Sequence, residues 1–147
     1  VFRRSRGKGK RNLDGYEAIW QHLTGAPLHF PPPRYSEPVI MKPVHFAWRP
    51  GTASGIEQKD LGRFSDRGAE VTVYRLVPGK RRVLPGKDHL RIMFVMKGRG
   101  KCGRKSYLRH SAIEFSSGEA AAFTPEARTE LLCMTIPSVT AMGLKAA

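Results

Sequence analysis

The feature that most constrains the fold of this 147-residue chain is a succession of short β-type segments, each closed by a turn. From residue 35 onward, apolar and β-branched residues occur in short runs that are separated by Pro, Gly, Asp and Ser. The runs cover residues 39–41, 45–48, 56–61, 71–77, 90–96, 111–115, 120–124 and 130–136. Many short strands at close spacing are typical of a β-sandwich or barrel, so the sequence predicts a mainly β fold.

One helix is predicted ahead of the strands, over residues 13–23. Its apolar residues recur with helical spacing, with Asn12 placed to cap its start and Gly25 just beyond its end. Prolines make residues 25–34 a stiff connector, and Trp20 is expected to anchor the helix in a core. The apolar stripe consists of Leu13, Tyr16, Ile19, Trp20 and Leu23.

Basic residues are in large excess, with 26 Lys and Arg against 12 Asp and Glu. Six cations and no anion stand in residues 1–12, which are therefore expected to form a disordered arm. Eleven cations and a single acid, Asp88, stand in residues 80–109. Such clusters attract nucleic acid, membranes or acidic metabolites. Because no stacking aromatic pair, zinc-finger spacing or helix-turn-helix pattern accompanies them, a small anionic ligand ranks above nucleic acid.

The two cysteines, Cys102 and Cys133, do not suggest a disulfide framework, and a reducing, cytoplasmic location fits them. No signal-peptide pattern and no run of about 18 apolar residues is present, so a soluble protein is expected. The chain begins with Val, and we expect a trimmed or excised fragment. The expected organisation is a basic arm at 1–12, the helix and proline-rich connector at 13–34, a barrel at 35–140 and a tail at 141–147.

The stretch from residue 78 to 125 carries two sets of spaced glycines and prolines that resemble the motifs of the cupin superfamily. The resemblance implies a jelly-roll β-barrel, in which the family's three His and one Glu bind a divalent metal. Matching Gly79 and Gly98 to the glycines of the first motif puts Pro85 and Lys87 at its two His positions and Arg91 at its Glu position.

The second cupin motif keeps its framework in the same way. Gly118 and Pro125 match, but the His position falls at Arg128 or Thr129, with no Asn behind it. The resemblance therefore implies a cupin-type jelly roll with a degenerate metal site, for which no cofactor is expected.

Within the superfamily, residues 45–50, 55–62 and 94–100 resemble cupins grouped with 2,4'-dihydroxyacetophenone dioxygenase and anti-sigma-factor-type barrels. This resemblance spans residues 38–137 and implies, as one alternative, a dioxygenase that uses Fe or another divalent metal on an aromatic or ketone substrate. Its ligands would have to come from His45, His89, His110 and a Glu, which lack the spacing of a metal site. Barrels without the metal also occur as the second half of double cupins, which implies a homo-oligomer or a companion barrel.

The residues around His89 form the candidate ligand site, because strand alternation places Lys87, His89 and Arg91 on one face. If this face points to solvent, the cations are merely solvated; this arrangement is slightly preferred. If it points into the barrel, an anion must replace the metal, because a buried cation without one is costly. Arg128, at the second-motif His position, completes the expected ligand set.

The function expected from the sequence is binding of a small, anionic molecule, or a structural and dimerising role as part of a two-barrel protein. The alternatives are the metal-dependent dioxygenase and electrostatic nucleic-acid binding through the arm and residues 80–109. No catalytic residue is assigned, because no P-loop, nucleophile elbow or dinucleotide fingerprint is present.

Overall fold

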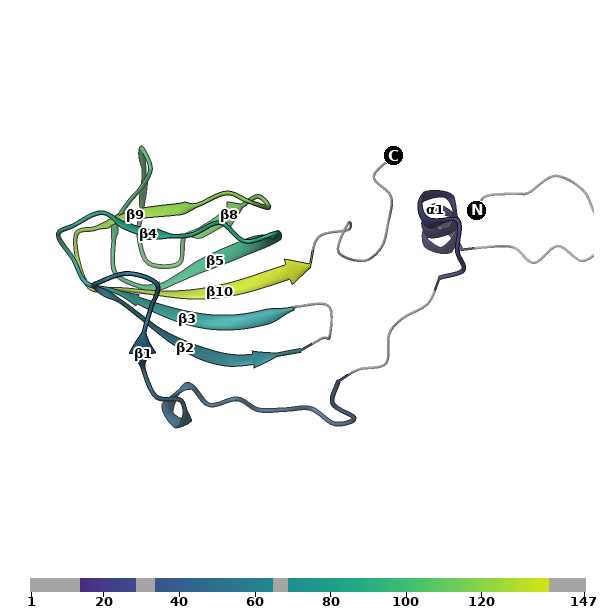
Figure 1. The fold of residues 1–147 in the computed structure, drawn as a ribbon, viewed down its shortest axis with the longest axis horizontal. Coiled ribbons are helices and arrows are strands. Elements are labelled where there is room, and N and C mark those ends of the chain that lie inside the picture. The colour runs from purple at the N-terminus through teal and green to yellow at the C-terminus, as the bar shows by residue number, and fades with distance from the viewer. Residues whose placement is uncertain (1–13, 29–33, 65–68, 138–147) are drawn as a thin grey trace, which may run out of the picture. The chain divides into compact units, whose positions relative to one another are not determined.

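The computed structural model describes residues 14–28, 34–64 and 69–137 (Figure 1). The predicted arm at 1–12, the tail at 141–147 and His29 lie outside these residues. The elements found within the described ranges are a helix, a short 3-10 helix and ten strands. Their bounds are α1 (Gly15–Thr24), η1 (Pro43–His45), β1 (Arg49–Pro50), β2 (Ile56–Arg63), β3 (Glu70–Leu76), β4 (Arg82–Leu84), β5 (His89–Lys97), β6 (Gly100–Cys102), β7 (Lys105–Tyr107), β8 (Ala112–Phe115), β9 (Ala121–Pro125) and β10 (Thr129–Pro137).

The helix α1 begins later than the sequence predicts. Asp14, not Asn12, is its N-cap residue, and Gly25 ends it at a φ of 67°. The amide of Gly25 donates to the carbonyl of Gln21 at 2.9 Å, which is the left-handed closure that glycine permits. No residue of α1 is buried, and Trp20 is half-buried. No helix among the described residues is long and apolar enough to cross a membrane.

The strands form two antiparallel sheets that stack as two layers (Figure 1). The larger sheet has the order β1-β2-β3-β10-β5-β8, and the smaller has the order β4-β9-β6-β7. The last described strand, β10, lies in the middle of the larger sheet and pairs with both β3 and β5. The predicted mainly β, cupin-type architecture with a short helix before the strands is confirmed.

The core lies between the two inner faces. Alternate residues of each strand point inward, because successive side chains of a strand lie on opposite sides of the sheet. Phe123 from β9 packs edge-on against Tyr107 from β7 and Phe115 from β8, at ring-centroid distances of 5.7 and 6.0 Å. The buried core cluster consists of Ile56, Tyr74, Leu76, Leu84, Met93, Val95, Tyr107, Phe115, Ala121, Phe123, Leu131 and Cys133.

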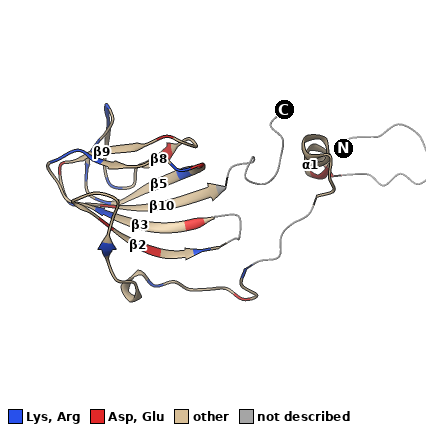
Figure 2. Cartoon of the chain, viewed as in Figure 1, with Lys and Arg blue, Asp and Glu red and all other residues tan. Residues whose placement is uncertain are grey.

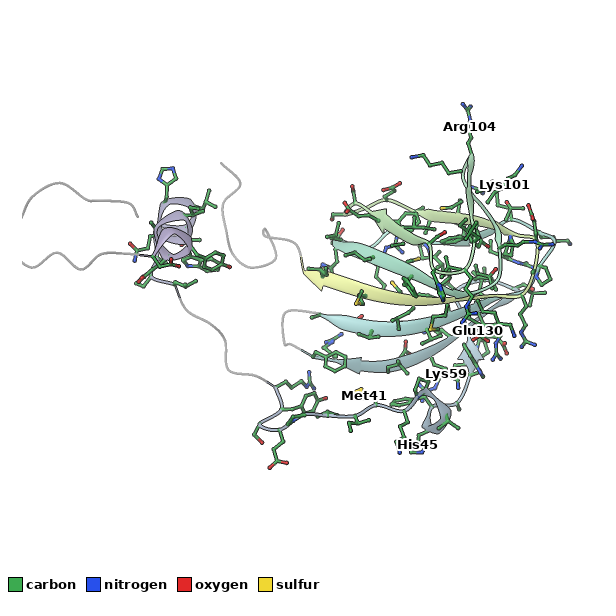
Figure 3. All side chains as sticks on the ribbon, turned by 180° about the vertical axis from the view of Figure 1, so that it is seen from behind. Met41, His45, Lys59, Lys101, Arg104 and Glu130 are labelled. Carbon is green, nitrogen blue, oxygen red and sulfur yellow. The ribbon has the colours of Figure 1, made fainter. Side chains whose placement is uncertain are left out.

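The segment before β1 lies over the outer face of β2 and β3. Lys59 on β2 donates to the carbonyl of Pro43 at 2.8 Å, and the Arg75 guanidinium on β3 lies 3.7 Å from the centre of the Trp48 ring. Figure 3 shows Met41 and Lys59 on this side of the barrel. Two strands predicted here are wrong: neither residues 39–41 nor residues 45–48 form a strand, and His45 is the last residue of η1. Prolines at 38 and 43 interrupt the ladder that a strand would need.

Candidate functional site

The inner face of the larger sheet changes from apolar to polar along the barrel. At one end, Leu76, Val95 and Leu131 are fully buried and surrounded by core residues. At the other end, Arg91 pairs with Phe115 on one side and with Thr135 on the other, and Thr135 pairs with Glu70. We call this second region the polar end; its residues are Lys87, Arg91, Cys133, Thr135, Thr72 and Glu70.

Arg91 lies inside the barrel, with only 2% of its surface exposed. The slightly preferred outward orientation is therefore wrong. The reason is the alternation of β5: Met93 and Val95, on the same face as Arg91, are fully buried, whereas Ile92 and Phe94 are half-buried on the outer face. The site therefore contains a charged side chain within a largely apolar interior.

The guanidinium of Arg91 is bonded to backbone carbonyls. Nη1 donates to the carbonyl of Pro85 at 3.0 Å, and Nη2 donates to the carbonyl of Glu119. The guanidinium carbon also lies 5.5 Å from the centre of the Phe115 ring. Nε is buried with no hydrogen-bond partner, and among the described residues no carboxylate lies within ion-pair distance of Arg91. A buried cation held only by neutral acceptors retains an unbalanced charge.

Two loops supply these carbonyls, and they meet closely. The loop before β5 carries Pro85, and the loop before β9 carries Glu119. The amide of Gly118 donates to the carbonyl of Lys87 at 2.8 Å. A Cβ on Gly86 would collide with the carbonyl of Gly118, so glycine is required at this approach.

Lys87 and Glu70 form the rim of the polar end. The Lys87 ammonium lies 3.5 Å from a carboxylate oxygen of Glu70, and Arg63 donates to the other oxygen of this carboxylate at 2.6 Å. Burial raises the pKa of Glu70, but the hydrogen bond from Arg63 and the charge of Lys87 outweigh it and hold the pKa below its usual value. Glu70 is therefore ionised at neutral pH and neutralises part of the rim charge.

Cys133 is a buried residue of β10 that pairs with Thr72 on β3 and with Met93 on β5. Burial raises the pKa of its thiol, while the positive charges of Arg91 and Lys87 oppose the increase. Because both charges act on the same sulfur, Lys87 and Arg91 belong to one electrostatic environment. Burial also raises the pKa of the neighbouring Tyr74 to about 12. Both groups are therefore uncharged at neutral pH, and the cations supply the net charge of the polar end.

The other predicted ligand residues have different positions. His89 is half-buried at the start of β5, where its Nδ1 contacts the carbonyl of Asp88. Arg128 precedes β10, whereas Thr135 of the polar end is near the end of that strand. The exposed Arg128 side chain lies 4.0 Å from Glu57. The structure therefore places Lys87 and Arg91 at the polar end, with His89 at the start of the strand that carries Arg91, and places Arg128 at the opposite end of the barrel.

The three candidate metal ligands do not converge. His45 ends η1 on the outside of the barrel (Figure 3), and His110 stacks on Phe94 of the outer sheet face at 5.9 Å. Only His89 adjoins the polar end. Within residues 14–28, 34–64 and 69–137, no three His, Cys, Asp or Glu side chains gather as a metal site.

A separate surface hollow of about 410 Å³ lies beside β1 and contains none of the polar-end residues. It is lined by residues 48–51 and 53–57, including Trp48 and Glu57. The Trp48 ring is already in contact with Arg75 at 3.7 Å and with Lys59 at 4.7 Å. The hollow is thus distinct from the site around Arg91.

Sequence reasoning did not identify Glu70, Cys133 or Thr135 as site residues. The pairing of the strands relates these residues to the site, because Thr135 on β10 lies opposite both Arg91 and Glu70. That pairing depends on β10 lying between β3 and β5, and the order of strands within the sheet is not visible in a sequence of short β runs.

Comparison with known proteins gives structural matches only. No protein-family model and no curated protein sequence matches the chain. An RmlC-like cupin protein from Ralstonia eutropha matches with a TM-score of 0.55 and 10% identity, over 67% of this chain and 69% of that protein. Hydroxypropylphosphonic acid epoxidase from S. wedmorenis matches with a TM-score of 0.54 and 12% identity, over 71% of this chain and 63% of the epoxidase.

A structure of Rhodobacter sphaeroides SigE with the anti-sigma ChrR also matches, with a TM-score of 0.49 and 17% identity, over 61% of this chain and 49% of the matched chain. The two matches with higher TM-scores are likenesses of the strand framework at low sequence identity. Together with the two antiparallel sheets, they show that this chain has a cupin-type fold.

Proposed function

We propose that the barrel binds a small anionic molecule at its polar end. The observation that carries this proposal is the buried Arg91 guanidinium, whose Nε has no partner and whose Nη atoms meet only neutral carbonyls. An anion with a carboxylate or phosphate group can accept from the planar guanidinium and balance its charge.

The surrounding residues suit such a ligand. The Lys87 side chain is 41% exposed, so its ammonium can turn from Glu70 toward an anion that enters the polar end. The Thr135 side chain, on the same sheet row as Arg91, adds a hydroxyl. Phe115 and Tyr74, which are 4% and 7% exposed, make the interior beside Arg91 aromatic. His89 adjoins the entrance as a further donor.

A divalent metal does not fit the same place. The cupin resemblance puts Lys87 and Arg91 at positions where the family has metal ligands, and both side chains are cations. A second positive ion beside the buried Arg91 would add repulsion in a poorly solvated interior. No step of a dioxygenase reaction is therefore assigned to the described residues.

A second role, self-association, is supported by the outer face of β5 and β10. Leu132 pairs with Phe94, Met134 with Ile92, and Ile136 with Leu90, which creates a continuous apolar strip. Met134 and Ile136 are 38% and 41% exposed. Strips of this kind mark interaction surfaces, and a second copy or a companion barrel would cover this one.

The ligand proposal is tested by urea unfolding in phosphate, citrate or benzoate, at constant ionic strength. A ligand that binds only the folded state raises the free energy of unfolding by about 2.7 kcal/mol at 100 times its dissociation constant, and so raises the urea midpoint. Lys87→Gln should weaken this effect, whereas Arg109→Gln, a matched change at an exposed cation outside the polar end, should not. Equal effects of all three anions on all variants would contradict a built site.

The self-association proposal is tested by sedimentation of the wild type and of Met134→Lys. A charge in the middle of the strip should reduce the mass to that of one chain without lowering the unfolding midpoint. A wild-type protein that sediments as one chain at high concentration would reject it.

A further inference from the structure

Exposed cations gather at the end of the barrel opposite to Arg91. Three segments meet there: the turn after β3, the turn between β5 and β6, and the turn between β9 and β10. The amide of Gly79 donates to the carbonyl of Pro125 at 3.0 Å, and the amide of Glu126 donates to the carbonyl of Arg99 at 3.0 Å. The adjoining β6–β7 hairpin, paired to β9 through Lys101 and Thr124, continues this surface.

We call this surface the cationic end. Its members share two properties: each is exposed, and none has a carboxylate within 4.0 Å among the described residues. The one acid in the three turns, Glu126, lies 3.7 Å from Arg99. The six cations are Lys80, Arg81, Lys97, Lys101, Arg104 and Lys105.

The figures show where this charge lies. In Figure 2, blue segments mark the projecting β6–β7 hairpin and the turns at one end of the barrel. Figure 3 shows Lys101 and Arg104 extending from the hairpin away from the core. Long side chains on a projecting hairpin can adjust to charges on a large partner, whereas a small ligand would leave most of them without a contact.

We propose that the cationic end binds the phosphate backbone of double-stranded nucleic acid without reading its sequence. A duplex presents closely spaced negative charges, and lysine and arginine side chains that contact phosphates release condensed counterions. The six exposed cations without carboxylate partners supply the positive charge for such contacts, and the site is separate from the anion site around Arg91.

The aromatic residues near this surface favour a duplex over a single strand. Binding of single strands relies on bases stacking on exposed aromatic rings. Tyr107 and Phe123, the aromatic residues of β7 and β9, are 3% and 0% exposed. The strongly exposed apolar residues that flank the cationic end, Val77 and Leu108, are aliphatic. Among the described residues of this surface, no exposed Trp or Tyr provides the aromatic anchor that is common in protein interfaces.

The test measures binding of the whole chain to a labelled DNA duplex of mixed sequence by fluorescence anisotropy, between about 50 and 200 mM salt. In one variant Lys101, Arg104 and Lys105 are replaced by Gln. The matched control preserves charge, with Lys101→Arg, Arg104→Lys and Lys105→Arg. A position control carries Lys42→Gln, an exposed cation on the segment before β1. The basic N-terminal residues are the same in every variant, so their contribution cancels.

The neutral triple variant should bind about 10-fold or more weakly at 0.1 M salt, with a salt slope shallower by about 2 to 3. The charge-preserving triple and Lys42→Gln should keep the wild-type slope, and a duplex of another sequence should bind equally well. The proposal is overturned if the neutral triple keeps the wild-type slope while unfolding at the same urea concentration. It is also overturned if a single strand, poly-glutamate or anionic vesicles bind the same residues more tightly than the duplex.

Discussion

Replacement of Arg91 by Met most directly tests what the buried cation contributes to stability and to anion binding. The substitution keeps an unbranched side chain of similar length and removes the charge. Two charge-assisted hydrogen bonds are lost, each worth about 1.5–3 kcal/mol, together with a cation–π contact of about 0.5–2 kcal/mol. Against this, the variant no longer buries an unpaired Nε–H, which costs about 1–3 kcal/mol, nor a cation, whose desolvation costs several kcal/mol.

These contributions nearly cancel, so we expect Arg91→Met to change the free energy of unfolding by no more than about 2 kcal/mol without ligand. Pro85 and Glu119 belong to exposed loops, so water can replace the guanidinium at their carbonyls. The effect on ligand binding is large by comparison, because the main hydrogen-bond donor to the anion is removed. Stabilisation of the wild type by an anion, about 2.7 kcal/mol at 100 times the dissociation constant, should vanish.

The assay is urea unfolding with and without phosphate, citrate or benzoate at constant ionic strength, with Arg109→Met as the control for loss of an exposed arginine. Destabilisation of Arg91→Met by more than about 4 kcal/mol would show that Arg91 is required for the fold itself. Retention of the full anion effect in this variant would show that the ligand binds elsewhere.

Three further results are expected. Glu70 has a lowered pKa in the folded protein, so its stabilising interactions are complete above its unfolded pKa and are lost as pH falls through its folded pKa. The stability difference between wild type and Glu70→Gln, measured by urea unfolding from neutral to acid pH, should therefore shrink toward zero. A difference that stays constant with pH would contradict this. Cys133 is 2% exposed and its thiol has a raised pKa, so a thiol reagent at neutral pH should label it only after unfolding. The half-buried Cys102 should react earlier, and equal labelling rates of the two cysteines in the native protein would refute the buried position of Cys133. Gly86→Ala should lower the free energy of unfolding by about 1–3 kcal/mol, because its Cβ collides with the carbonyl of Gly118. Gly103→Ala, at a position with φ 58° and open space, should lower the free energy of unfolding by about 1–2 kcal/mol through backbone strain and leave the anion effect unchanged.

Much of the fold follows from local sequence. The predicted runs at 56–61, 71–77, 90–96 and 130–136 coincide with β2, β3, β5 and β10, because alternating apolar residues pack on a sheet whatever their neighbours are. Strands β4, β6 and β7 were not predicted. Each has three residues, and their polar or glycine-containing sequences resemble turns. They are ordered by tertiary pairing, of β4 and β6 with β9 and of β7 with β6.

The candidate site was predicted only in part. Strand alternation grouped Lys87, His89 and Arg91 on one face. The sequence does not decide which face of β5 points inward, because its outer residues, Ile92 and Phe94, are apolar as well. A strand that is apolar on one face and mixed on the other allows both orientations. Glu70 and Arg128 show the same limit, because their distances from Arg91 follow from strand order and not from sequence separation.

The position of β10 at the centre of the larger sheet has a consequence for how the molecule is made. Its partners β3 and β5 begin at Glu70 and His89, yet neither can complete its hydrogen-bonded ladder until residues 129–137 are available. Contacts between residues far apart in the sequence slow folding. In a nascent chain, the edges of β3 and β5 remain unpaired until β10 has been synthesised. Synthesis speed and chaperone access should therefore affect the yield of folded barrel more than local sequence changes in the early strands.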